Sequence, residues 1–229
     1  NASNISTNSA NIATNTSDIA DNTSDISNLD NTISAPNKNV FYVSKNGNDT
    51  TGTGSINKPF LTVQAAANAV GTAANSADYV DITKRYYSVK IGPGQYTENV
   101  TFGTRLVIEL DFDNSLIVGN VQVDFDKGIA SGQVPRQPKF ILHGNDLRPG
   151  GGIGSIPQNG IDGNLIWEYI NGGGSVTCQI MIQNIGITGN VVAQLGSGGT
   201  NNPNTQLFCA EAYMSGQFIV NNGMSGSIR

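Results

Sequence analysis

The sequence predicts an all-β solenoid preceded by an α-helical coiled coil, and three observations lead to this fold class. Isoleucine recurs every seven residues over the first 35 residues, which is the spacing of a coiled coil. From residue 40 onward, apolar and polar residues alternate in short segments separated by turns of Gly, Asn, Asp and Pro, as β-strands do. Asparagine returns ahead of these strands at intervals close to the length of one solenoid coil.

Composition and charge argue against several classes of protein. Of the 229 residues, 13% are charged and 28 are glycine, which is too little charge and too much glycine for a helical enzyme. The 12 basic and 17 acidic side chains leave a net charge of -5, which argues against a nucleic-acid partner. No apolar run approaches the roughly 20 residues that a bilayer span needs, so we expect no membrane insertion. Because the chain begins at Asn1 rather than Met, we expect an excised piece of a longer polypeptide, and because residues 205–229 end without an evident cap, we expect the β-domain to continue beyond residue 229.

Residues 1–35 are predicted to form a coiled-coil stalk. Heptad position a is Ile5, Ile12, Ile19, Ile26 and Ile33, and position d is Asn8, Asn15, Asn22 and Leu29. A strict seven-residue repeat predicts a left-handed supercoil, and the helix from Ile5 to Ile33 would be a rod of roughly 43 Å at about 1.5 Å per residue. The other positions are mostly poor helix formers, so partner chains must stabilise the helix.

Asparagine at position d favours a homotrimer. Three side-chain amides converge on the axis of a trimer, where they can hold water or an anion such as chloride. The candidate ion-binding residues are therefore Asn8, Asn15 and Asn22. The pattern Ile-x-x-Asn-Thr resembles the stalks of trimeric autotransporter adhesins and viral fibres, and this resemblance implies the same anion site. The alternative is a disordered polar linker with an accidental isoleucine spacing.

The elements of a second domain follow in order over residues 40–229. Ala35-Pro36 ends the first helix, and residues 36–39 form the linker. We expect a strand at 40–43, then a helix near 60–70 that begins after Pro59 and stops at Gly71. Further strands are predicted at 88–92, 100–102, 106–112, 116–125, 139–142, 165–169 and 176–187. No second helix is evident in this domain, so a solenoid, a sandwich or a barrel remains.

The recurring asparagine favours the solenoid. The positions are Asn99, Asn120, Asn145, Asn164 and Asn190, at intervals of 21, 25, 19 and 26 residues. The Gly-Asn dipeptide carries no weight by itself, because both residues are common in this chain. Asparagine tolerates the left-handed conformation and bonds neighbouring amides, which suits a coil corner. We expect the helix near 60–70 to cover the N-terminal end of the stack.

Three segments of this domain resemble the opening of pectin-lyase-like right-handed parallel β-helices. They are residues 41–49 (FYVSKNGND), 58–66 (KPFLTVQAA) and 89–100 (VKIGPGQYTENV). The resemblance is good over residues 41–102 and only general beyond them. It implies a right-handed parallel β-helix but no particular chemistry, because the family includes polysaccharide lyases and hydrolases, viral tailspikes, and surface proteins of large DNA viruses and bacteria.

Two acidic segments supply the candidate catalytic residues. In 106–113 and 121–126, acidic and apolar residues alternate, so the acidic side chains share the outer face. The candidates are Asp111, Asp113, Asp124 and Asp126. If the coils stack in register, these carboxylates lie on adjacent rungs roughly 4.8 Å apart. Such acids could cleave a glycosidic bond or hold Ca²⁺, and the alternative is an ordinary solvated face.

The remaining chemistry-bearing residues give weaker signals. Trp167 and Tyr169 could stack on sugar rings, although core packing explains them equally well. His143, the only histidine, has no nucleophile elbow beside it, which favours a surface or turn position. Cys178 is expected to be a buried thiol, with a stacked disulfide to Cys209 as the alternative. No zinc-ligand spacing is present, and we expect no metal or cofactor.

Together these features predict the base of a homotrimeric fibre or spike at a virion surface or another extracellular location. Its role would be structural, presenting a host-attachment surface to cell-surface glycans. The alternatives are a polysaccharide lyase or hydrolase of the tailspike type, which would use the four aspartates, and a bacterial trimeric adhesin.

Overall fold

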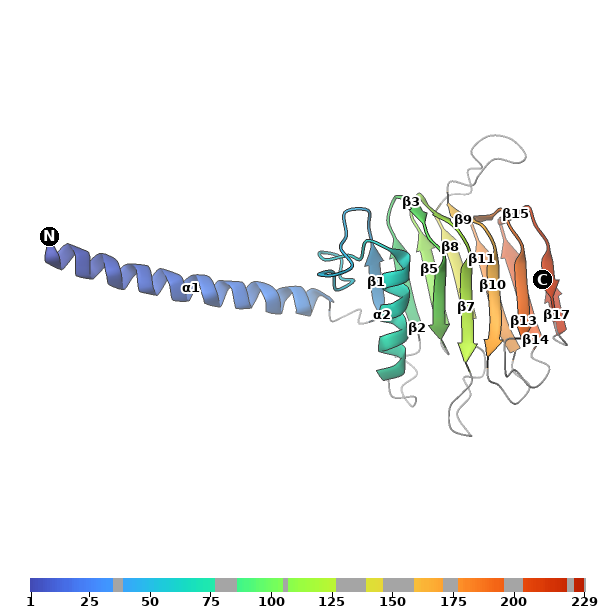
Figure 1. Ribbon diagram of the computed structural model, residues 1–229, viewed down its shortest axis with the longest axis horizontal. Coiled ribbons are helices and arrows are strands. Elements are labelled where there is room, and N and C mark those ends of the chain that lie inside the picture. Colours follow the sequence, from blue (N-terminus) through green and yellow to red (C-terminus); the bar gives the residue numbers. More distant parts are fainter. Residues whose placement is uncertain are drawn as a thin grey trace. The chain divides into compact units, whose positions relative to one another are not determined.

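The computed structural model describes residues 1–34, 39–76, 86–104, 107–126, 139–145, 159–170, 177–195, 204–221 and 225–228 (Figure 1). The chain forms two compact units, residues 1–38 and 39–229, which are described separately.

The first unit is a single α-helix, α1 (Ala2–Ser34). Three threonine hydroxyls on this helix donate hydrogen bonds to the backbone carbonyl four residues earlier, at 2.7–3.1 Å, which satisfies these side chains without a tertiary contact. The helix prediction for the stalk is confirmed. Its predicted end at Ala35-Pro36 and the linker at 36–39 fall mostly outside the described residues.

The second unit is a parallel β-helix made of three sheets (Figure 1). Sheet A runs in the order β1 (Val40–Val43), β2 (Tyr86–Ile91), β5 (Val107–Phe112), β8 (Lys139–Gly144), β11 (Thr177–Gln183), β14 (Asn204–Ala210), β17 (Ser225–Ile228). Sheet B holds β3 (Gly94–Thr97), β6 (Ser115–Val118), β9 (Gly160–Asp162), β12 (Gly186–Ile187) and β15 (Tyr213–Met214). Sheet C holds β4 (Val100–Thr104), β7 (Val121–Asp126), β10 (Leu165–Ile170), β13 (Val191–Leu195) and β16 (Phe218–Val220). From β2 onward the chain visits A, B and C in turn, so each circuit adds one strand to every sheet, and the predicted solenoid is confirmed.

The core lies between the three sheets. Each strand turns alternate side chains inward, as in β5, where Ile108, Leu110 and Phe112 are all fully buried. The rings of Phe102 and Phe140 have centroids 5.7 Å apart, and those of Phe140 and Trp167 are 6.4 Å apart. These contacts join successive coils through apolar and aromatic packing.

The corner between sheets B and C is built from stacked asparagines. The side-chain oxygen of each asparagine accepts a hydrogen bond from a backbone N–H one coil later, at 2.8–3.0 Å. Asn99 accepts from Asn120, Asn120 from Asn164, Asn164 from Asn190, and Asn190 from Gln217. The coil lengths are 21, 44, 26 and 27 residues. Asn145 was wrongly placed in this series. It follows β8 at the corner after sheet A, where its side chain donates to Asp113 at 3.3 Å.

Two predicted strands were too long, because a residue of positive φ divides each of them: Gly119 in one and Asn184, at φ +54°, in the other. The predicted strand 116–125 is divided into β6 and β7 by Gly119-Asn120, and the predicted strand 176–187 is divided at residues 184–185. Gly119 has φ +144°, and a Cβ there would lie 2.2 Å from the carbonyl oxygen of Glu98. The Gly-Asn dipeptide, which we discounted in the sequence, therefore does mark this corner in three coils.

Helix α2 (Val63–Ser76) packs against β4, β1 and β2 and covers the N-terminal end of the stack, as expected (Figure 1). Its boundaries differ from the prediction of 60–70. Phe60 instead pairs with Val43 in a parallel bridge, because the loop before it returns to sheet A. Gly71 does not end the helix, which continues to Ser76, and a Cβ at this position would make only an ordinary contact, 3.6 Å from the Gly103 carbonyl oxygen. The N-terminal N–H groups of α2 are bound by side chains of Asp49, Thr62 and Glu98.

Candidate functional site

The first functional feature is the exposed isoleucine face of α1. Ile5, Ile12, Ile19 and Ile26 are 66–68% exposed and spaced seven residues apart. Four large apolar side chains in one heptad register on an otherwise polar helix indicate a surface that is covered by another helix. The asparagines at positions 8, 15 and 22 are also exposed. The side chains of Leu29 and Ile33 lie outside the described residues.

The second feature is a groove of about 390 Å³ on the outer side of sheet A. We call it the groove throughout; its lining residues are Tyr42, Val43, Ser44, Ile56, Pro59, Lys90, Ile91, Gly92, Asp111, Asp113 and Asn145. They come from three places: the loop between β1 and α2, the outward side chains of β1, β2 and β5, and the corners after β2, β5 and β8. The groove is therefore made of segments that are up to about a hundred residues apart in sequence and are brought together by coil stacking.

A row of outward side chains crosses sheet A at the groove. Strand register aligns Tyr42, Lys90, Asp111 and His143 on four successive strands. The Lys90 ammonium pairs with the Asp111 carboxylate, and His143 Nδ1 lies 3.5 Å from the other oxygen of the same carboxylate. Burial lowers the pKa of Lys90, but the hydrogen bond and charge of Asp111 raise it by more, so the pKa lies above its ordinary value. Lys90 therefore stays charged at neutral pH.

A neighbouring pair on the same sheet joins Tyr86 and Glu109. The Tyr86 hydroxyl donates a hydrogen bond to the Glu109 carboxylate. Burial, the hydrogen bond and the charge of Glu109 together raise the pKa of the phenol well above its usual range. Both acids on the outer face of β5, Glu109 and Asp111, thus have a partner on β2.

The structure separates the four candidate aspartates. Asp111 and Asp113 both line the groove, but Asp124 lies on sheet C. The expectation that β5 and β7 form adjacent rungs was wrong, because the chain passes through sheet B between them and they belong to different sheets. The side chain of Asp126 lies outside the described residues.

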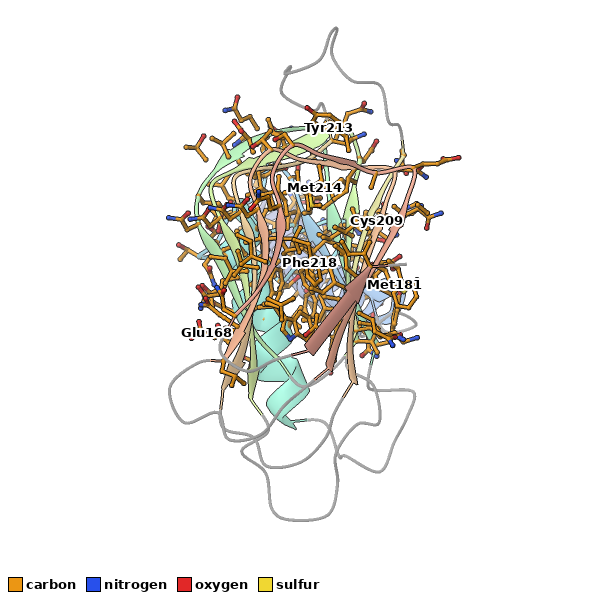
Figure 2. All side chains as sticks on the ribbon, turned by 90° about the vertical axis from the view of Figure 1, so that its right-hand side faces the viewer. Glu168, Met181, Cys209, Tyr213, Met214 and Phe218 are labelled. Atoms are coloured by element: carbon orange, nitrogen blue, oxygen red, sulfur yellow. The ribbon has the colours of Figure 1, made fainter. Side chains whose placement is uncertain are left out.

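Asp124 has an acidic neighbour that the sequence analysis missed. Strand register places Glu168 beside it on β10, and the Gln122 amide nitrogen donates to Asp124 at 2.6 Å and to Glu168 at 2.9 Å. In the end view of Figure 2, Glu168 on sheet C and Met181 on sheet A lie on opposite sides of the stack. The sequence analysis missed this pair because the two residues lie one coil apart and that coil has 44 residues, so the spacing in sequence does not reveal which strands are neighbours.

Trp167 does not offer its ring to a ligand. It is 1% exposed and packs in the core, which corrects its assignment as a ligand-binding residue. The side chain of Tyr169 lies outside the described residues. Sequence reasoning instead overlooked Tyr42, Lys90 and Ile56, whose common position depends on the path of the loop after β1.

The cysteines are not stacked on one another. Register places Cys178 opposite Thr205 and Cys209 opposite Ile182, so the two cysteines are separated by about four residues along the strands, roughly 13 Å. Cys209 is a free cysteine on the exposed side of β14, and the partial burial of its thiol raises the pKa above its ordinary value. The side chain of Cys178 lies outside the described residues.

Within the described part of the chain, no three His, Cys, Asp or Glu side chains are grouped as metal ligands would be. Neither α1 nor α2 has both the length and the hydropathy of a membrane-spanning helix. The chain matches no known family model, no curated protein and no solved structure.

Proposed function

We propose that this chain is a structural and attachment component of an extracellular fibre or spike, such as a virion fibre, in which α1 joins three copies. The observation that carries the proposal is the row of four exposed isoleucines at heptad spacing on α1. A helix of this composition does not hold its shape alone, so assembly supplies the stability. The β-helix then presents its outer faces to the host surface.

Three copies are favoured over two by asparagine at position d. A β-branched residue at a with leucine at d suits two strands, whereas repeated Asn8, Asn15 and Asn22 place polar layers in the interface. Three amides around an axis satisfy one another through a central water or anion such as chloride. Three equivalent binding faces raise the avidity for a host glycan even where each contact is weak.

The test is the solution mass of the intact chain by light scattering, which should be three times 24.0 kDa. The double variant Ile12→Ser/Ile19→Ser should be a monomer, because it removes two apolar layers from the interface. The matched control Ala13→Ser/Ala20→Ser also introduces two serines, but at heptad positions outside the interface, and it should stay trimeric. A monomeric intact chain contradicts the proposal.

A polysaccharide-cleaving activity is the second candidate, because Asp111 and Asp113 line one groove. Glycoside hydrolysis needs two carboxyl groups that flank the scissile bond, and one of these two, Asp111, is already paired with the Lys90 ammonium. Asp111→Asn and Asp113→Asn should abolish glycan cleavage if this candidate is correct. An unchanged rate removes both residues from consideration. A bacterial trimeric adhesin is the third candidate, and it shares the stalk argument.

A further inference from the structure

We infer that the groove beside Lys90 and Asp111 binds a single neutral pyranose residue, such as the end of a host glycan. This inference rests on the proposed function for its biological purpose, but the groove itself is argued from its own geometry. Its volume of about 390 Å³ is near the lower end of the roughly 300–1,000 Å³ of typical ligand pockets, which suits a ligand as small as one sugar ring.

The groove is formed before any ligand arrives. The backbone N–H of Tyr42 donates to the carbonyl of Gly54 at 2.8 Å, and Tyr42 in turn accepts from Phe60 at 2.9 Å. The Asn48 side chain accepts from two N–H groups of the loop, at 2.8 and 2.9 Å. A loop held by these bonds loses little conformational entropy on binding, so weak polar contacts still yield measurable affinity.

Charge decides the class of sugar. Lys90, Asp111 and Asp113 are the formally charged residues of the lining, so the groove carries a net charge of -1, and Lys90 is already paired with Asp111. Asp113 is exposed, and its described partners are two asparagine amides at 3.3 Å. A sialylated, sulfated or phosphorylated ligand would meet an unpaired carboxylate, whereas a neutral sugar hydroxyl would donate to it.

The two kinds of surface in the groove match the two kinds of surface on a pyranose ring. Ile56, 59% exposed, Pro59 and the Tyr42 ring provide apolar contact area for the C–H face. Asp113, Asn145 and Ser44 provide acceptors and donors for the hydroxyl groups around the ring edge. These polar residues come from different segments of the chain, so they set the orientation of the sugar.

The test uses the intact chain and saturation-transfer NMR with a panel of methyl pyranosides (glucose, galactose, mannose and N-acetylglucosamine) and with N-acetylneuraminic acid as the acidic probe. At least one neutral pyranoside should bind, and the acidic sugar should not. Asp113→Ala and Ile56→Ser should each weaken binding about tenfold, since each removes a contact of the bound ring. Asp124→Ala on sheet C is the matched control and should bind as the intact chain does.

Both groove variants change exposed side chains, so each should unfold at the same temperature as the intact chain, and a thermal melt of each variant checks that it is folded. The inference is overturned if no neutral pyranoside binds, if the acidic sugar alone binds, or if the groove variants bind as well as Asp124→Ala. The mass of the same samples separates the two proposals. A trimer that binds no sugar overturns this inference alone, and a monomer that binds a neutral sugar overturns the stalk alone.

Discussion

Single glycine residues allow the coils to approach closely at the corner between sheets B and C. Gly119 has φ +144° and Gly163 has φ +158°, and a Cβ at either position would lie 2.2 Å from a carbonyl oxygen of the preceding coil. Each glycine precedes an asparagine whose amide continues the stack to the next coil. Glycine supplies the space and asparagine supplies the hydrogen bond, so the two residues act as one unit.

Replacing a glycine by alanine should lower the stability of the fold at this corner but not on the neighbouring strand β4. Gly119→Ala should lower the free energy of unfolding by about 3 kcal/mol, because the methyl group meets the Glu98 carbonyl and the backbone angle disfavours a side chain. Gly103→Ala is the matched control, since nothing lies within 4 Å of the new Cβ, and it should be neutral or raise stability by about 0.5 kcal/mol. Urea unfolding measures both. Equal effects of the two substitutions would contradict this view of the corner.

At the scale of secondary-structure elements, α2 depends on side chains that come from other elements. The Glu98 carboxylate, at the corner between β3 and β4, accepts hydrogen bonds from the N–H groups of Val63 and Gln64, both at 2.9 Å. Asp49 accepts from the N–H groups of Leu61 and Thr62 at 2.7 and 3.0 Å. A negative charge at a helix N-terminus is stabilising, so these two acids hold the cap on the first coil.

Removing the Glu98 carboxylate should therefore weaken the cap. We expect Glu98→Ala to destabilise the β-helix by about 1–2 kcal/mol, because two N–H groups at the helix N-terminus lose their acceptor. Glu98→Gln keeps one side-chain oxygen and should lose less. The midpoint of urea unfolding, followed by tryptophan fluorescence from the buried Trp167, is the measurement. An unchanged midpoint for Glu98→Ala would show that the cap is held by packing of α2 alone.

Across the described part of the β-helix as a whole, every titrating group with a shifted pKa has a raised one, so all of them affect stability at high pH in the same direction. Burial raises the pKa of Tyr87, and burial together with the charge of Glu98 raises that of Tyr96 to about 12. The pKa of Lys90 is also raised, through Asp111. A folded state that holds protons more tightly than the unfolded chain is stabilised at low pH and loses that stabilisation as pH rises.

Stability should accordingly fall as the pH rises from 9.0, the ordinary pKa of the Cys209 thiol, through 10.0, that of the tyrosines, toward about 12. Well below these values the groups hold their protons in both states, and as the pH passes them the unfolded chain releases protons that the folded chain retains. The urea midpoint measured across this range checks the sign. Tyr96→Phe should make the fall shallower, at the cost of the 2.9 Å hydrogen bond to the Gly92 carbonyl. A midpoint that rises with pH in this window would contradict the assignment.

The sequence by itself determined the helix of the first unit, the solenoid of the second, the covering helix and four of the five corner asparagines. These features follow from local periods, about 3.5 residues for the stalk and two for the strands, which any window of the chain contains. Which residues lie side by side on the outer faces was decided only by the tertiary structure. Strand register places Asp111 beside Lys90 and Asp124 beside Glu168. The coils have 21, 44, 26 and 27 residues, because segments inserted between strands lengthen a coil in sequence but leave the spacing of adjacent strands at about 4.8 Å. The groove depends on the same stacking, since its lining joins a loop before the first coil to corners of three later strands.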